Sequence, residues 1–240
     1  VARCAAGLKD AGVQKGDRVA AVLANCPEAV TGALASASVG GVWSSCSPDF
    51  GISGIHDRLG QIEPKVLITV NAYHYNGKEH SCLEKIREVL KEIPSISKTV
   101  VVQFTDSIIS FEQDEEDWNE FLNRKEENPD YEQLNFDHPL YIMYSSGTTG
   151  LPKSIVHGAG GTLLKHLTEQ RYHGDLKPGD RLFYFTTCGW MMWNWLISGL
   201  ASGATLMLYD GSPFYPHENV LFDFAADWGA QIFGTSAKFL

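Results

Sequence analysis

The sequence has few of the features that mark membrane, metal-binding or disulfide-stabilised proteins. Its 240 residues contain no apolar run of about 18 residues, so we expect no membrane-spanning segment. The five cysteines are scattered, odd in number and never in C-x-x-C spacing, which argues against zinc sites and a disulfide framework. A reducing, cytoplasmic setting is therefore expected.

A surplus of basic residues is also absent. The net charge is −10, and the segment 104–137 accounts for it, because it holds 12 acids and 2 bases while the remainder has 17 of each. Binding to nucleic acid requires an excess of lysine and arginine, so no nucleic-acid partner is expected. The acidic run is typical of a solvated surface.

Apolar runs and amphipathic helical patterns alternate on both sides of this acidic segment. Val19 to Leu23 is continuously apolar, as buried parallel strands are, whereas Ala29, Val30 and Ala33 recur at helical spacing. The pattern predicts helices up to residue 11 and at 27–39, 53–62, 83–93, 162–172, 191–201 and 220–227, and strands at 18–24, 42–45, 66–70, 99–104, 140–145, 181–185, 204–209 and 231–233.

This alternation predicts an α/β fold of stacked, mostly parallel β-sheets with flanking helices. We divide it into a first β-α subdomain (1–104), an acidic linker or surface excursion (105–137) with a short helix near Trp118, and a second, truncated β-α subdomain (138–240).

A loop rich in glycine and hydroxyl groups follows the strand expected at 140–145. It reads Ser145-Ser146-Gly147-Thr148-Thr149-Gly150-Leu151-Pro152-Lys153. Glycine lets the backbone approach an oligophosphate, hydroxyls donate hydrogen bonds, and Lys153 supplies a positive charge. Leu151 and Pro152 separate Lys153 from the last glycine, so the Walker loop of NTPases is absent. Composition alone also fits an ordinary surface loop.

Two further loops, at 186–190 and 210–213, follow expected strands. Ligands of parallel sheets gather at the carboxyl ends of strands, so all three loops should face one crevice if their strands share a sheet. The loop at 186–190 leads into Gly189-Trp190-Met191-Met192-Trp193-Asn194-Trp195. This segment could line a small cavity or form ordinary helix core. The residues alone leave both interpretations open.

The loop at 145–153 resembles the phosphate-binding signature of the adenylate-forming enzymes, the superfamily of acyl-CoA synthetases and luciferases. The early β-α repeat, the Trp-Met segment, 201–205 and 209–213 are similar to acyl-CoA synthetases in the same order along the chain. Within the superfamily, 145–150 and 189–195 resemble the acetoacetyl-CoA synthetases, because acetyl-CoA synthetases carry Thr-Gly-His where Met192, Trp193 and Asn194 stand.

The resemblance implies an incomplete adenylate-forming fold and a ligase that converts acetoacetate and CoA to acetoacetyl-CoA through an acyl-adenylate. Its substrates would be ATP with Mg²⁺, acetoacetate and CoA, and its products AMP, pyrophosphate and acetoacetyl-CoA. ATP phosphates would be bound by Ser145, Ser146, Gly147, Thr148, Thr149, Gly150 and Lys153. The acyl group would contact Trp190, Met191, Met192 and Pro213, with Asn194 as the candidate for its 3-oxo group.

Other groups receive no assignment in this chain. The resemblance places the catalytic and metal-binding parts beyond Leu240, and CoA has only Lys78 as a weak candidate. Lone acids and histidines such as Asp210, His217 and His157 are usually solvated or structural.

The chain starts at Val1 without an initiator methionine or a signal-peptide pattern. We therefore expect it to begin inside a longer polypeptide. Because the resemblance implies that essential parts follow Leu240, we expect the 240 residues alone to be inactive. Two alternatives stay open: a ligase for acetate or propionate, and a truncated module that only binds.

Overall fold

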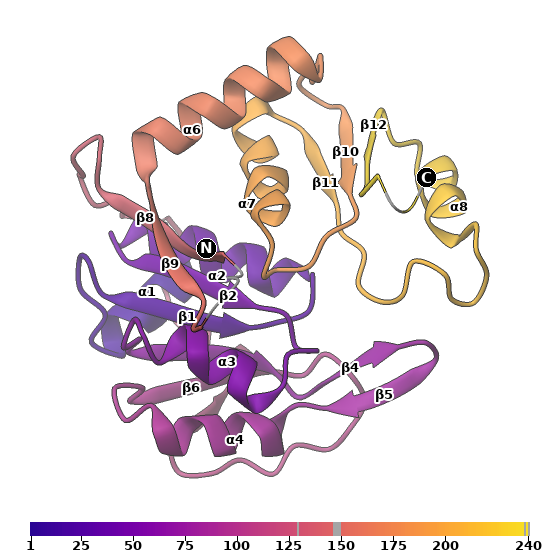
Figure 1. The fold of residues 1–240 in the computed structure, drawn as a ribbon. Coiled ribbons are helices and arrows are strands. Elements are labelled where there is room, and N and C mark those ends of the chain that lie inside the picture. Colours follow the sequence, from indigo (N-terminus) through magenta and orange to yellow (C-terminus); the bar gives the residue numbers. More distant parts are fainter. Residues whose placement is uncertain (129, 146–149, 238, 240) are drawn as a thin grey trace.

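The structure, a computed structural model, describes residues 1–128, 130–145, 150–237 and 239. Strands and helices alternate along the chain, as predicted (Figure 1). The helices are α1 (Ala2–Asp10), α2 (Pro27–Ser38), α3 (Ile52–Leu59), α4 (Leu83–Glu92), α5 (Trp118–Phe121), α6 (Ala159–Thr168), the π-helix η1 (Glu169–His173), α7 (Met191–Ser198), the 3₁₀ turn η2 (Gly199–Ser202) and α8 (Val220–Asp227).

The strands form three sheets within the described residues. They are β1 (Arg18–Val22), β2 (Val42–Cys46), β3 (Val66–Val70), β4 (Ala72–Tyr75), β5 (Lys78–Ser81), β6 (Lys98–Val102), β7 (Glu115–Asp117), β8 (Pro139–Ser145), β9 (Lys153–Gly158), β10 (Arg181–Tyr184), β11 (Thr205–Met207) and β12 (Ile232–Gly234).

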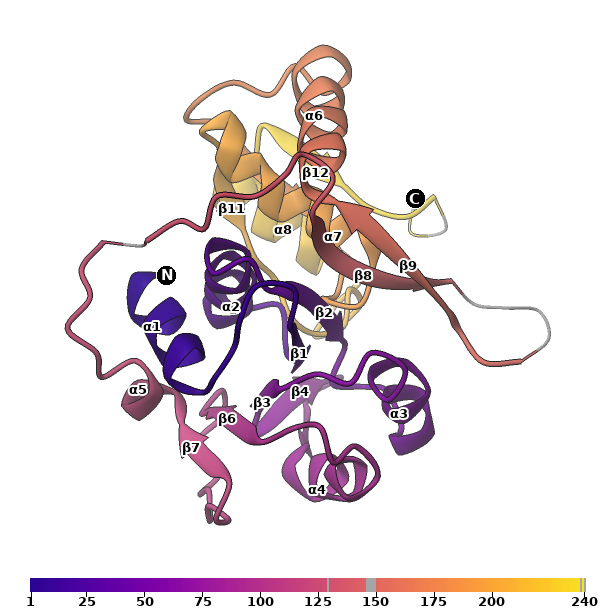
Figure 2. The ribbon, with the colours of Figure 1, turned by 90° about the vertical axis from the view of Figure 1, so that its left-hand side faces the viewer.

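The larger sheet has seven strands in the order β7-β6-β3-β1-β2-β8-β9, and only the β8–β9 pair is antiparallel. Helices cover both faces, as Figure 2 shows. Val19 and Ala21 of β1 pack in the cluster that includes α1 and α2, whereas Ala20 and Val22 pack with α3 and α4. Burial on both faces explains why the central strands are largely apolar and why β1 is continuously so from Val19 to Val22.

The second sheet has three parallel strands in the order β11-β10-β12. Leu182 packs with Leu196 of α7 on one face, and Phe183 packs with Leu221 of α8 on the other. Figure 1 shows α7 and α8 on either side of this sheet. The third sheet is the hairpin β4–β5, which projects below the second sheet in this view.

Most predicted elements are present with bounds shifted by a few residues. The strand at Val66–Val70 and the helix at Val220–Asp227 have the expected ends. The helix expected at 162–172 starts earlier, at Ala159, and its last part is the π-helix η1. The hairpin β4–β5 was not expected.

The seven-stranded sheet contains strands from both sides of the predicted acidic linker. β8 pairs with β2 at Tyr141 and Trp43, and the acidic segment contributes β7 and the buried side chains of Trp118 and Phe121. The larger sheet therefore takes strands from before, within and after the acidic segment. The division at residues 104 and 137 stays a prediction.

A helix that could cross a bilayer would have to be long and apolar, and none of the helices in the described ranges meets both conditions.

Candidate functional site

The two arms of the predicted phosphate loop are neighbouring strands. β8 ends at Ser145 and β9 begins at Lys153, and these two residues are directly paired in the antiparallel ladder. Lys153 is exposed, and Gly150 has a φ of 123°; among the described residues, no atom beyond its chain neighbours lies within 4 Å of the position a Cβ would take. The remaining predicted phosphate ligands, Ser146, Gly147, Thr148 and Thr149, lie outside the described residues.

Gln61 anchors the C-terminal arm of this loop. Its Nε2 donates a 2.8 Å hydrogen bond to the carbonyl oxygen of Pro152, and its Oε1 accepts a 3.1 Å hydrogen bond from the Ser154 hydroxyl. These two contacts lie on either side of Lys153. Sequence reasoning missed Gln61, because the contact spans 91 residues and no local pattern marks it.

A cavity of about 290 Å³ lies at the carboxyl ends of β10 and β12. Trp190 and Met192 line it, as the acyl-site prediction requires, together with Tyr184, Phe185, Thr186, Thr187 and Ser236. The Trp190 side chain is 64% exposed and stands at the edge of this space. Ligands of parallel sheets bind at this end of the strands, so the cavity is a candidate acyl site.

Thr187 is a residue of this cavity that the sequence interpretation did not single out. Its Oγ1 is buried and has no hydrogen-bond partner among the described residues. Buried hydroxyls are normally paired, so this one is a candidate hydrogen-bonding group for a ligand, which it would reach by a turn of the Thr187 side chain toward the cavity.

The structure does not bring the other predicted acyl residues to this cavity. Met191 packs against the larger core, with its Sδ 3.9 Å from the Tyr141 hydroxyl. Asn194 is 2% exposed, and its Nδ2 lies 3.1 Å from the Met143 Sδ. Met192 and Asn194 are two positions apart on α7, which puts their side chains on opposite faces. Pro213 lies in the loop after β11, outside the cavity lining.

The expectation of a single crevice rested on strands of one sheet, and this premise is wrong. β8 belongs to the seven-stranded sheet, whereas β10 and β11 belong to the three-stranded one. Two of the loops nevertheless meet the carboxyl end of β1. The backbone N–H of Asn25 donates to Asp210 Oδ1 at 2.9 Å, and its Nδ2 donates to the carbonyl oxygens of Tyr209 and Thr186 at 3.2 and 3.5 Å.

Asp210 is held at this junction in an environment that opposes its charge. Burial raises the pKa of its carboxyl group, and the negative charge of Asp49 adds to this effect. The hydrogen bond from Asn25 and the nearby His74 lower the pKa without cancelling the rise.

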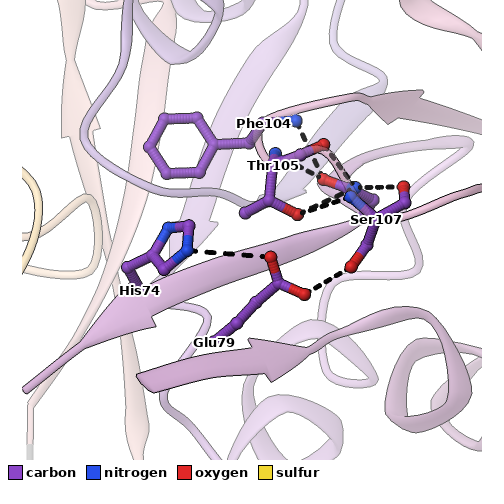
Figure 3. A network of polar contacts seen from close by, with 6 residues as sticks. His74, Glu79, Phe104, Thr105 and Ser107 are labelled. Carbon is purple, nitrogen blue, oxygen red and sulfur yellow. Dashed lines mark hydrogen bonds and ion pairs between the residues drawn. The ribbon is translucent and has the colours of Figure 1, made fainter. Parts of the chain in front are cut away.

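Asn71 fixes the base of the β4–β5 hairpin, which carries Lys78, the weak CoA candidate. Its Oδ1 accepts hydrogen bonds from the backbone N–H groups of Phe104 and Thr105 at 2.8 and 3.1 Å, and its Nδ2 donates to the Ser107 carbonyl at 3.0 Å. Figure 3 shows three labelled members of this network, Phe104, Thr105 and Ser107, with the hydrogen bonds as dashed lines. The buried amide thereby joins the hairpin to the chain that follows β6.

A second contact ties the hairpin itself to this turn. Glu79 of β5 accepts a hydrogen bond from the Ser107 hydroxyl, and His74 of β4 lies 3.7 Å from its other carboxylate oxygen (Figure 3). The hydrogen bond from Ser107 lowers the pKa of Glu79. Lys78, next to Glu79, is exposed on this hairpin and stays a prediction for CoA binding.

A family model described as AMP-binding enzyme matches residues 1–240, the whole of the sequence. The chain belongs to the AMP-binding enzyme family. The family match agrees with a nucleotide-binding interpretation of the loop at 145–153. The roles of its individual residues in binding phosphate stay predictions.

Similar members of the family cover all or nine-tenths of the chain. Acetoacetyl-coenzyme A synthetase of Rhizobium meliloti (strain 1021) is 53% identical over 100% of this chain and 37% of its own length. Malonamoyl-CoA synthetase vrtB of Penicillium aethiopicum is 46% identical over 90% of this chain and 31% of its own length. The chain thus spans about a third of the length of these relatives.

The solved structure of acetoacetyl-CoA synthetase from Streptomyces lividans has the same fold, with a TM-score of 0.95 and 47% identity. It covers 99% of this chain, which in turn covers 36% of it. The predicted fold class, mostly parallel sheets with flanking helices in part of the adenylate-forming fold, is therefore confirmed.

Proposed function

We propose that the polypeptide carrying this chain is an AMP-forming ligase that joins acetoacetate to CoA. A carboxylate oxygen of acetoacetate attacks the α-phosphorus of ATP and pyrophosphate leaves, giving acetoacetyl-adenylate. The CoA thiol then attacks the acyl carbon, and AMP leaves. The observation that carries this proposal is the similarity to acetoacetyl-CoA synthetases over the whole chain, at 53% and 47% identity.

The loop between β8 and β9 binds the phosphates of ATP in this proposal. Ser145 and Lys153 approach from paired strands, Gly150 adds backbone without a side chain, and Ser146, Gly147, Thr148 and Thr149 complete the loop. The exposed ammonium group of Lys153 supplies the positive charge. Because the carboxylate needs no general base, catalysis depends on positioning and charge stabilisation.

Magnesium enters the proposal only as part of the substrate, bound to ATP. Among the residues that the structure describes, no group of three or more His, Cys, Asp or Glu side chains is placed to hold a metal ion. We therefore assign no step to a metal bound by this chain.

Trp190 and Met192 form the acyl wall, and the Thr187 hydroxyl donates to the 3-oxo group. This assignment is supported by the position of Thr187 in the cavity lining and by its buried Oγ1, which has no partner among the described residues and would turn toward the acyl group. Asn194 fits less well, because its Nδ2 already faces Met143 and its free Oδ1 is an acceptor, as a ketone oxygen is. Met191 and Pro213 would act from outside the lining.

The relative named malonamoyl-CoA synthetase favours a class of substrate rather than one acid. Malonamoyl and acetoacetyl groups both carry a carbonyl at the third carbon, whereas acetyl and propionyl groups do not. A short acid with a 3-carbonyl group is thus favoured over acetate or propionate, and malonamate is the second candidate.

Carboxylate-dependent ATP-pyrophosphate exchange by the polypeptide that carries this sequence tests the proposal. We expect exchange with acetoacetate to exceed exchange with acetate and propionate. Malonamate is assayed in parallel, because it is the second candidate substrate. Higher activity with acetate would overturn the substrate but leave the ligase. Absence of exchange with every acid would leave the alternative of a binding module.

A further inference from the structure

The helix α3 holds the β8–β9 hairpin from one face. Tyr144 and Ser154 are directly paired in the antiparallel ladder, so their side chains share a face. The next pair, Ser145 and Lys153, takes the opposite face, because side chains alternate along a strand. Gln61, which follows α3, accepts a hydrogen bond from the Ser154 hydroxyl. Figure 1 shows the loop end of β9 beside α3. The helix therefore reaches the predicted phosphate loop from behind the face that carries its lysine.

Arg58, in the last turn of α3, makes the contact with the other arm of the loop. Its guanidinium carbon lies over the Tyr144 ring, 6.0 Å from the ring centroid, and over the Phe50 ring at 4.7 Å. Its Nη1 donates a 2.7 Å hydrogen bond to the carbonyl oxygen of Gly54, one turn earlier in the helix. The guanidinium is thereby held beside Tyr144, the residue that precedes Ser145.

The charge of Arg58 is not neutralised by an acid. Among the residues that the structure describes, no carboxylate oxygen lies within 4.0 Å of its guanidinium, and the adjacent Asp57 faces His56 at 3.7 Å. Burial raises the pKa of Tyr144, so the ring is neutral and the contact is with its π face rather than with a phenolate. A planar guanidinium stacks on aromatic rings, whereas a lysine ammonium is a compact point charge. The contacts therefore depend on the guanidinium group rather than on charge alone.

We propose that Arg58 is a positioning residue for the phosphate loop. By holding the Tyr144 ring, it sets where β8 ends and so where Ser145 stands opposite Lys153. Because it acts from the opposite face, it is not itself a ligand of the phosphates. This inference rests on the proposed binding of ATP by the loop. It gives both arms an anchor at the end of α3, Arg58 for β8 and Gln61 for β9.

The test compares the binding of ATP and AMP to the polypeptide that carries this sequence, by isothermal titration calorimetry without any acid substrate. Arg58→Lys keeps the positive charge and removes the planar group. We expect the Kd for ATP to rise about threefold to tenfold, because the Tyr144 ring loses its partner. The Kd for AMP, which lacks the outer phosphates, should change by less than about twofold. An equal loss for both nucleotides, or an unchanged Kd for ATP, would overturn the proposal.

Two substitutions of Tyr144 test whether Arg58 acts through the ring. Tyr144→Phe keeps the ring and loses the 3.3 Å contact of its hydroxyl with Ser44, so ATP binding should be unchanged. Tyr144→Leu removes the ring and should weaken ATP binding as much as Arg58→Lys does. The double variant of Arg58→Lys with Tyr144→Leu should lose little more, because both changes remove the same contact. Additive losses, or an equal loss in Tyr144→Phe, would overturn the proposal.

Arg18→Lys is the matched control. Arg18 is also partly buried and donates to the backbone carbonyls of Ile62 and Glu63, but it stands at the start of β1, at the other end of the parallel strands from the loop. Its substitution should leave the Kd for ATP unchanged. A loss as large as that in Arg58→Lys would overturn the proposal.

The outcome for Arg58→Lys remains decisive if Tyr144→Leu does not fold. An unmodified polypeptide that binds no ATP would refute the proposed function of the loop, and the positioning role of Arg58 with it. ATP binding that is intact in the unmodified polypeptide and equally intact in Arg58→Lys would refute the positioning role alone.

Discussion

The indole N–H of Trp193 donates a 2.9 Å hydrogen bond to Oδ1 of Asn25, across 168 residues of the sequence. Asn25 follows β1 in the seven-stranded sheet, and Trp193 lies in the first turn of α7, where its ring stacks on Trp43 at 6.4 Å. The same asparagine binds the loops after β10 and β11. The buried amide of Asn25 therefore joins the larger sheet to α7.

Replacing Asn25 with alanine should lower the free energy of unfolding by about 3 kcal/mol, because it leaves the Trp193 N–H and the Tyr209 carbonyl without their partner. Urea denaturation measures this loss. In a double-mutant cycle with Trp193→Phe, we expect a coupling of about 1 kcal/mol. Strictly additive effects would show that the Asn25–Trp193 bond contributes nothing.

Lys153→Met should raise the KM for ATP by about tenfold or more, because a charged hydrogen bond to phosphate is lost. The matched control is Lys165→Met on α6, where the lysine is exposed and its ammonium group lies 2.8 Å from Glu169. Steady-state kinetics of the polypeptide decide the matter. Equal effects of both substitutions would mean that general surface charge, rather than this loop, governs ATP binding.

Gln61→Leu should raise the KM for ATP about threefold to tenfold and leave the KM for acetoacetate unchanged, because the side chain holds the backbone on either side of Lys153. Ser154→Ala removes only one of the two contacts and should raise the KM for ATP by less. In the double variant the two effects should not add, because both substitutions remove the same contact. A parallel rise in both KM values would argue for a general loss of structure instead.

Thr187→Val keeps the shape of the side chain and removes the hydroxyl. We expect the KM for acetoacetate to rise about tenfold, while the KM for butyrate, which lacks the 3-oxo group, stays the same. Thr186→Val is the control, because its hydroxyl already donates to the Thr187 carbonyl at 3.3 Å. If butyrate and acetoacetate respond alike, Thr187 shapes the cavity without recognising the ketone.

Most of the fold could be predicted because its central strands are buried on both faces. The run at Val66–Val70 is buried throughout, is apolar except for Thr69, and has the bounds expected from the sequence. The β4–β5 hairpin escaped prediction because its strands are short and largely exposed, although Asn76-Gly77, both at positive φ, is a typical hairpin turn signal.

The candidate site was less predictable, because it depends on which face each side chain takes. Trp190 and Met192 share a cavity, but Asn194 lies across α7 from them, as helical periodicity requires. Thr187 and Gln61 carry no local signal, since an unpaired hydroxyl and a contact across 91 residues arise only after the chain has folded.

Asp210→Asn should stabilise the protein at neutral pH and have little effect in acid. The pKa of Asp210 is raised mainly by burial, so the folded state favours the protonated form, and stability is lost as the pH rises through the folded pKa. Asparagine retains an acceptor for the Asn25 N–H but carries no charge. Melting temperatures measured across the acid range should therefore diverge upward for the variant as the pH rises. The exposed Asp227→Asn on α8 serves as control, and a gain at Asp210 that does not vary with pH would contradict the raised pKa.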